Sequence, residues 1–343
     1  MKYQSLGNTG LYVSELTLGT MTFDEEGGSY SARMGATGQE LATKMVNLCI
    51  DAGVNLFDTA NIYASGLSEV MLGKAIGDKR HNVLIATKLH NTMTHGANDL
   101  GTSRIAIMRE VEASLTRLGT DYIDLYQVHN YDYTTPLEET MRALDDLVRQ
   151  GKVRYIGLSN FTGWQIAKAD GIAKQLGTER FCSAQSSYSL VGRELERDII
   201  PATIDLGLGN MIYSPLAGGY LSGKYTGDNQ EEGRRTSFGY PPVDEAQGLE
   251  VLKLLAAMAE EKNASIAQVA LAWLLHKPGV TSVIIGARKE EQLVDNLGAT
   301  EIELSADEMK QLDRVSRLKP EYPGYLAALS RSSNLYGQKA DDK

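Results

Sequence analysis

Runs of Val, Ile, Leu and Tyr alternate along the chain with segments that read as amphipathic helices. A short apolar run bounded by turn residues is typical of a strand buried on both faces, whereas apolar positions three and four residues apart indicate a helix. Eight apolar runs predict strands at residues 15–21, 55–60, 82–89, 121–129, 153–160, 181–188, 210–216 and 281–287. The order is strand, then helix, throughout.

Helix start signals support this alternation. Capping boxes are predicted at Thr37-x-x-Glu40, Ser265-x-x-Gln268 and Thr135-Pro136-x-Glu138, the last with Pro at the first helical position. Strands that alternate with helices form a parallel sheet, and eight units spaced mostly about 30–40 residues apart favour a (β/α)8 TIM barrel over an open doubly wound sheet. The sequence therefore predicts an α/β barrel in one domain, residues 1–343.

Three segments fall outside the alternation. Residues 1–13 place the turn-rich GNTG between YQSL and LYVS, which predicts a β-hairpin that plugs the N-terminal end of the barrel. Residues 218–242 are rich in Gly, charged and aromatic residues and predict a long loop or lid. Residues 330–343 are polar and predict a flexible tail.

The composition excludes several classes of function. Hydrophobic residues make up 42% of the chain and the net charge is −10, which argues against a nucleic-acid partner or an anionic membrane surface. The longest nearly apolar stretch, residues 264–275, is too short to span a bilayer, and the start of the chain lacks a signal-peptide core. We expect a cytoplasmic protein with no membrane partner.

Cysteine and histidine residues do not predict a metal or disulfide framework. The two cysteines, Cys49 and Cys182, lie in apolar contexts and are too few for either. His90 and His95, with His81 nearby, lie around a polar stretch that has no acidic residues at ligand spacing. We therefore predict no metal site.

Polar residues end nearly every predicted strand. In a (β/α)8 barrel the active site forms at the carboxyl ends of the strands. The residues found there are Asp58, Lys88, His129 with Asn130, Ser159 with Asn160, Gln185, Tyr213 with Ser214, and Gly286-Ala287-Arg288. Any one of them could face solvent or cap the next helix. A carboxylate, an ammonium, an imidazole and the nearby phenol of Tyr63, all at one mouth, favour an active site instead.

The charges in this group suggest roles. Asp58 and Lys88 are expected to form an ion pair, which offsets the cost of burying either charge alone. Lys88 close to Tyr63 would lower the phenol pKa from its ordinary value of about 10 and so make Tyr63 a proton donor. His129 could hydrogen-bond a substrate oxygen or extend the proton relay.

A proton donor beside a carbonyl oxygen requires a separate source of electrons for the carbonyl carbon. No side chain supplies a hydride, so a nicotinamide cofactor is expected. The G-x-G-x-x-G dinucleotide fingerprint does not occur after any predicted strand. The cofactor site must therefore be built differently.

The chain resembles the aldo-keto reductases, which are NADP-dependent oxidoreductases on a (β/α)8 barrel. The resemblance covers nearly the whole chain, through LGNTGLYVSELTLGTM, NLFDTANIYASGLSE, YIDLYQVHN, GKVRYIGLSNF, YSPLAGGYLSGKY and VIIGARKEEQLVDNLGA. It implies reduction of an aldehyde or ketone, with hydride from NADPH and a proton from Tyr63. The implied catalytic tetrad is Asp58, Tyr63, Lys88 and His129.

The resemblance also implies a set of cofactor contacts. Ser159, Asn160 and Gln185 would hold the nicotinamide amide, and Tyr213 would stack on its ring. The pyrophosphate would be lined by Ser214, Leu216, Gly218 and Lys224. The other implied contacts are Gly19, Thr20, Met21, Asp58, Pro215, Ile285, Gly286, Ala287, Arg288, Gln292 and Asn296.

The segment after the last predicted strand suits an anion. Gly286 opens a helix whose free N–H groups and dipole attract negative charge, and Arg288 adds a planar fork for phosphate. In the family this pocket holds the 2′-phosphate of NADP, with Gln292 and Asn296 toward the adenosine. Many relatives have Pro where this chain has Ile285, and cofactor preference varies among them. NADPH is expected in preference to NADH.

Aromatic residues around the predicted mouth are candidate substrate contacts. They favour an apolar or planar carbonyl compound, although such residues can equally pack the loops that carry them. The candidates are Phe23, Tyr30, Tyr131, Trp164 and Tyr220. No residue selects one substrate, and the sequence leaves the oligomeric state open.

Two other functions stay open from the sequence. Lys88 could be the Schiff-base nucleophile of an aldolase-type barrel, although Asp58 would keep it charged. The family also resembles potassium-channel β subunits, in which a cofactor-loaded barrel serves a membrane partner. No evident docking extension accompanies that resemblance.

Overall fold

The computed structural model describes residues 1–25, 30, 34–93, 96–224 and 240–326. Most of the predicted loop or lid at 218–242, and all of the predicted tail at 330–343, lie outside the described residues. The assignment of residues 1–343 to one domain stays a prediction.

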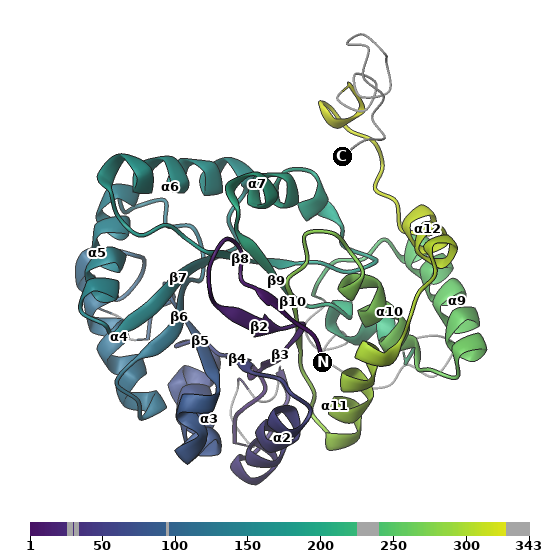
Figure 1. Cartoon of the computed structure of the whole chain (residues 1–343), viewed down its shortest axis with the longest axis horizontal. Helices are drawn as coiled ribbons and strands as arrows, with labels where there is room; N and C mark the ends of the chain where they lie inside the picture. The colour runs from purple at the N-terminus through teal and green to yellow at the C-terminus, as the bar shows by residue number, and fades with distance from the viewer. Residues whose placement is uncertain (26–29, 31–33, 94–95, 225–239, 327–343) are drawn as a thin grey trace.

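Eight parallel strands close into a barrel in the order β10-β3-β4-β5-β6-β7-β8-β9, which confirms the predicted (β/α)8 architecture. Figure 1 shows the helices as an outer layer around this barrel. Each predicted run corresponds to one strand, with β9 starting one residue before its run: β3 (Leu16–Gly19), β4 (Leu56–Asp58), β5 (Leu84–Leu89), β6 (Ile123–Val128), β7 (Val153–Ser159), β8 (Ser183–Ser187), β9 (Gly209–Tyr213) and β10 (Ser282–Ile285).

The helices follow the strands as the alternation predicts. The α-helices are α2 (Gln39–Asp51), α3 (Leu67–Ile76), α4 (Arg104–Leu118), α5 (Leu137–Arg149), α6 (Gly163–Leu176), α7 (Ile199–Leu206), α9 (Glu245–Lys262), α10 (Ile266–Leu275), α11 (Glu290–Leu297) and α12 (Ala306–Val315). Short 3-10 turns are η1 (Tyr63–Gly66), η2 (Gly77–Asn82), η3 (Glu194–Glu196), η4 (Ala217–Ser222) and η5 (Gly298–Glu301).

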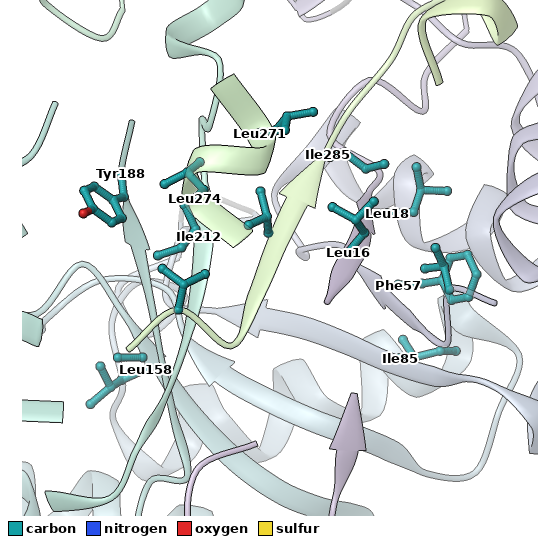
Figure 2. Packing of buried hydrophobic residues seen from close by; sticks show 14 of the residues in the cluster. Leu16, Leu18, Phe57, Ile85, Leu158, Tyr188, Ile212, Leu271, Leu274 and Ile285 are labelled. Carbon is teal, nitrogen blue, oxygen red and sulfur yellow. The ribbon is translucent and has the colours of Figure 1, made fainter. Parts of the chain in front are cut away.

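Alternate residues of each strand face opposite sides, and this divides the core in two. Outward residues such as Phe57 and Ile285 pack under the helices in the larger buried cluster. Figure 2 shows this layer, with Leu271 of α10 among the side chains around the strands. Inward residues such as Leu56 and Met211 belong to a second, smaller cluster inside the barrel. The residues at the carboxyl ends of the strands follow this same inward alternation.

The predicted hairpin is present and covers the bottom of the barrel. Strands β1 (Tyr3–Ser5) and β2 (Tyr12–Ser14) pair antiparallel, and Figure 1 shows the hairpin crossing the barrel. Leu6 and Val13 are fully buried in the inner cluster, where they close off its apolar floor. The hairpin thus extends one residue beyond the predicted end at residue 13.

The close packing of the hairpin backbone at Gly7 against other main-chain atoms leads to a first prediction. Gly7 has φ +61°, and a Cβ there would lie 2.5 Å from the carbonyl oxygen of Gly207 and 2.7 Å from that of Cys182. We expect Gly7→Ala to lower the free energy of unfolding by about 2–4 kcal/mol, from left-handed strain and overpacking together. The matched control is Gly10→Ala, because a Cβ at Gly10 meets nothing within 4 Å. Urea denaturation that shows equal stability of the two variants would contradict the close approach.

One of the three predicted capping boxes is present. Ser265 caps α10 in a full capping box with Gln268, as predicted. The other two boxes are wrong. Helix α2 starts after Gly38, while the Thr37 hydroxyl donates to Thr22 Oγ1. Helix α5 has Pro136 itself at the N-cap, because Asp132 Oδ1 accepts from the Thr135 amide and holds that residue in the preceding turn.

Candidate active site

The last inward position of several strands carries a polar side chain. Asp58 ends β4 and Lys88 lies near the end of β5, two residues after the inward Leu56 and Ala86. His129 follows β6 directly, and Gln185 occupies the same level on β8. The alternation of the strands therefore brings these groups into the barrel mouth.

The Lys88 ammonium is fully buried and has three oxygen partners. Its Nζ lies 2.6 Å from Asp58 Oδ2, 2.9 Å from the carbonyl oxygen of Thr59 and 3.4 Å from the Tyr63 hydroxyl. Burial alone would lower the pKa of Lys88, but the charges of Asp58 and Tyr63 and hydrogen bonds to both raise it above its ordinary value. The predicted ion pair is present, and it keeps a cation beside the phenol.

The second oxygen of Asp58 is held by two amides. Gln127 Nε2 lies 3.2 Å and Gln185 Nε2 lies 2.8 Å from Asp58 Oδ1. All three side chains are buried inside the barrel. The carboxylate therefore has partners on both oxygens, which satisfies the requirement for burying a charge.

A tight left-handed turn presents Tyr63. The phenol begins η1, in which Ala64, Ser65 and Gly66 have φ of 47°, 53° and 92°. Left-handed conformations are costly for residues other than Gly, and such strain tends to cluster at functional sites. The side chain of Arg117 packs under Gly66 and forms an ion pair with the fully buried Glu69, 2.6 Å away. The base of this turn is thus fixed.

His129 lies beside Tyr63 in the cavity lining. Their ring centroids are 5.8 Å apart with an interplanar angle of 80°. Surrounding protein lowers the pKa of His129 to about 3, and the positive charge of Lys88 acts in the same direction. The imidazole is therefore neutral in the folded state.

This neutral imidazole predicts acid sensitivity. An unfolded chain has a histidine pKa of about 6.5, so between pH 6.5 and about 3 the unfolded state binds more protons than the folded state. The free energy of unfolding therefore falls as the pH decreases through this window. Between about pH 7.5 and pH 5.5 the contribution of His129 is about 1 kcal/mol. Urea denaturation should show that His129→Gln loses less stability than the unsubstituted protein over this range; equal losses would contradict it.

The cavity lining next to His129 carries the residues expected at the nicotinamide. Asn160 Nδ2 donates to the main-chain oxygen of His129 at 2.9 Å, and the Tyr213 hydroxyl donates to Asn160 Oδ1 at 2.8 Å. Burial and the neighbouring Tyr240 raise the pKa of Tyr213. Asn160, Ser214 and Ala217 have φ of 58°, 51° and 49°. The main chain is thus left-handed at three positions along or beside this part of the lining.

The start of α11 closes the far end. Gln292 Oε1 accepts from the main-chain N–H of Arg288 at 3.1 Å. Asn296 is buried and donates to the oxygen of Gly286 at 3.3 Å. Among the residues that the structure describes, no carboxylate forms an ion pair with Arg288. Its guanidinium therefore keeps the capacity to bind an anion.

These groups share one cavity of about 450 Å³, within the size range of ligand sites. Every residue predicted to contact the cofactor lines it, together with Asp58, Tyr63 and His129 of the predicted tetrad. Lys88 lies directly behind them. The complete lining is Gly19, Thr20, Met21, Thr22, Met34, Asp58, Tyr63, His129, Ser159, Asn160, Gln185, Tyr213, Ser214, Pro215, Leu216, Gly218, Gly219, Ser222, Lys224, Tyr240, Ala267, Ile284, Ile285, Gly286, Ala287, Arg288, Gln292, Asp295 and Asn296.

The candidate substrate contacts do not line this cavity. Phe23 and Tyr220 are 1% and 3% exposed and belong to the hydrophobic core. The Tyr30 hydroxyl donates to the main-chain oxygen of Met21 at 3.1 Å. Tyr131 packs against Trp164, with ring centroids 6.0 Å apart, outside the cavity lining. Their proposed role as substrate contacts therefore has no support from the cavity lining.

Several lining residues went unnoticed in the sequence. Ile284 and Asp295 adjoin predicted residues, so proximity alone could have found them. Gln127 hydrogen-bonds Asp58 but does not line the cavity; it lies two residues before His129, and strand alternation could have placed it inside the barrel. Tyr240 falls within the predicted loop or lid at 218–242, which indicated its segment but not the residue, whereas Ala267 gave no signal.

The described residues contain no group of three or more His, Cys, Asp or Glu side chains placed to hold a metal ion. None of the helices described is both long and apolar enough to cross a membrane.

The fold and the cavity define a (β/α)8-barrel protein with acid–base groups gathered at the barrel mouth. A sequence model of the Aldo/keto reductase family matches residues 15–317, and the chain belongs to this family. Membership supports an oxidoreductase that acts on carbonyl compounds, and the family generally uses nicotinamide cofactors.

The chain is also similar to individual proteins over nearly its full length. It is 39% identical over 326 residues to an uncharacterised oxidoreductase of Bacillus subtilis, covering 92% of this chain and 96% of that protein. It is 35% identical over 353 residues to a candidate voltage-gated potassium channel subunit beta of Oryza sativa, covering 97% of each chain. It is 35% identical over 336 residues to a candidate aryl-alcohol dehydrogenase of Schizosaccharomyces pombe, covering 91% and 94%.

Proposed function

We propose that the protein is an NADPH-dependent oxidoreductase that reduces aldehydes or ketones to alcohols, with Tyr63 as the proton donor. One observation carries the proposal: the buried Lys88 ammonium joins Asp58 to the Tyr63 hydroxyl in a cavity that continues to Arg288. The cavity therefore unites acid–base groups with an anion-binding end.

The cavity lining suits NADPH. Ser159, Asn160 and Gln185 offer polar groups for the nicotinamide amide, and Tyr213 offers a ring beside them. The left-handed main chain at Ser214, Ala217, Gly218 and Gly219 and the start of α11 suit phosphate groups. When bound, the cofactor supplies the hydride.

Side chains of this protein donate the proton and stabilise the charge that it leaves behind. Lys88 stabilises the phenolate that forms as Tyr63 gives its proton to the substrate oxygen. Asp58 keeps Lys88 charged, and its own oxygens are held by Gln127 and Gln185. The neutral His129 can donate a hydrogen bond to the same oxygen without competing for the proton.

The direct test follows NADPH oxidation with a panel of aldehydes, ketones and dicarbonyls, alongside fluorescence titration of NADPH and NADH. We expect NADPH binding and turnover of at least one carbonyl class. A protein that binds neither cofactor would contradict the proposal.

Cofactor preference gives a sharper prediction. Arg288→Ala should weaken NADPH binding about 10- to 100-fold, because a charge-assisted hydrogen bond to the extra phosphate is lost. NADH affinity should change by less than about twofold, as NADH lacks that phosphate. Lys289→Ala removes the adjacent exposed cation and is the matched control. Equal losses for NADPH and NADH would contradict a 2′-phosphate contact.

A channel-subunit role is the second candidate, favoured by the 35% identity over 97% of both chains to the Oryza sativa protein. In that case the barrel would bind NADPH but act mainly through a membrane partner. Cofactor binding without turnover on the full carbonyl panel, together with co-purification with a channel, would support it over the reductase.

An aldolase-type function receives no support from the geometry. A Schiff base needs a neutral, accessible amine, whereas Lys88 is fully buried, ion-paired and has a raised pKa. Borohydride in the presence of a carbonyl compound and no NADPH should therefore fail to trap a covalent adduct on Lys88.

A further inference from the structure

The two ring nitrogens of His129 have different surroundings. Nδ1 lies 3.2 Å from Nδ2 of Asn91, which follows β5 by two residues. The ring lines the cavity beside Tyr63. Asn91 itself is not part of the cavity lining, so it touches the reaction only through His129.

The Asn91 contact selects one tautomer. A neutral imidazole carries its proton on Nδ1 or on Nε2, and the other nitrogen accepts. An amide NH2 group only donates, so a hydrogen bond from Asn91 requires Nδ1 as the acceptor. The proton then resides on Nε2.

A hydrogen bond also holds the main chain at Asn91. The main-chain oxygen of Asn91 accepts from Asn61 Nδ2 at 3.3 Å, and that nitrogen lies 2.8 Å from Glu110 Oε2.

Asn61 ties Asn91 to the segment that carries the phenol. It is fully buried and lies between Asp58 and Tyr63 in the chain. Its main-chain N–H donates to the oxygen of Lys88 at 3.1 Å. The loop after β5 and the loop after β4 are therefore held to each other behind the acid–base groups.

We propose that Asn91 is a positioning residue that holds His129 as the Nε2–H tautomer, so that the substrate oxygen receives hydrogen bonds from both His129 and Tyr63. The proposal rests on the proposed reductase function. The opposite tautomer would present a lone pair to the substrate oxygen and would oppose binding of the carbonyl group beside the phenol.

Nitrogen-15 NMR of histidine-labelled protein tests the tautomer without turnover. The chain has five histidines, and the His129 signals can be assigned by comparison with His129→Gln. In the unsubstituted protein we expect an unprotonated Nδ1 and a protonated Nε2. In Asn91→Asp the new carboxylate accepts from Nδ1–H, so the proton should move to Nδ1. Asn91→Leu removes the donor and should give a mixture of tautomers.

Kinetics test the consequence. Asn91→Asp should lower kcat/KM for a carbonyl substrate about 10- to 100-fold, the value of one hydrogen bond to an oxygen that gains charge in the transition state. NADPH affinity should stay within about twofold, which also reports that the barrel is folded. Asn98→Asp makes the same chemical change at an exposed position of the same loop and should match the unsubstituted protein in both measurements.

Three results would overturn the proposal. They are a proton on Nδ1 in the unsubstituted protein, an unchanged tautomer in Asn91→Asp, and a changed tautomer with unchanged kcat/KM. Binding of NADPH with no turnover of any carbonyl compound would instead contradict the proposed function. In that case the NMR result still decides whether Asn91 sets the tautomer.

Discussion

Replacing Tyr63 by Phe is expected to lower kcat about 10²- to 10⁴-fold, the range for loss of a general acid. The phenol hydroxyl lies 3.4 Å from the Lys88 ammonium, and Phe removes only that hydroxyl. The ring and the left-handed turn that presents it remain. Steady-state NADPH oxidation with the best substrate from the panel measures the effect.

Cofactor binding separates chemistry from folding in this variant. Fluorescence titration of Tyr63→Phe with NADPH should give an affinity within about twofold of the unsubstituted protein. Tyr12→Phe removes a phenol hydroxyl from the exposed face of the hairpin and should leave kcat unchanged. Normal turnover by Tyr63→Phe would eliminate Tyr63 as the proton donor.

The second large effect is expected from the buried ion pair. Asp58→Asn removes the charge that faces the fully buried Lys88 ammonium at 2.6 Å. It also replaces one acceptor oxygen by a donor among Lys88, Gln127 and Gln185. The free energy of unfolding should fall by about 3–5 kcal/mol, because an uncompensated buried charge remains.

A double-mutant cycle isolates the charge pairing. Lys88→Met should also destabilise the protein, since it leaves the buried Asp58 carboxylate without its cationic partner. The double variant Asp58→Asn/Lys88→Met should be more stable than the sum of the single losses predicts, because neither charge is left alone. Asp307→Asn disrupts an exposed pair with Lys310 and should change stability little. Additive losses in the cycle would show that the pair does not couple.

The alternation of strands and helices could be predicted from the sequence, because buried parallel strands are short apolar runs separated by helices with their own start signals. The prediction of the capping box before α5 failed because two side chains can accept a hydrogen bond from the same backbone N–H group. Asp132, rather than a capping box, holds the turn before α5, and nothing in the residues from 135 to 138 reveals that competition. Cap geometry depends on the loop that precedes the helix, which local sequence does not specify.

The polar residues of the candidate site could be predicted from the sequence for a similar reason. Asp58, Lys88 and His129 end or follow strands, and all strands of a closed parallel barrel end at one mouth. The contacts that loop residues make could not be predicted from the sequence. Phe23 and Tyr220 are aromatic residues of predicted mouth loops, yet both are buried in the core. Whether an aromatic side chain packs inward or faces the cavity is decided by the neighbours of the loop.

The sequence by itself determined the barrel, the level of the polar residues on the strands and the charge balance of the mouth, because these follow from periodicity and residue chemistry. The tertiary structure alone decided which groups meet: Gln127 and Gln185 on Asp58, and Asn91 on His129. Those contacts join segments far apart in the chain, and only closure of the barrel brings their side chains within hydrogen-bonding distance.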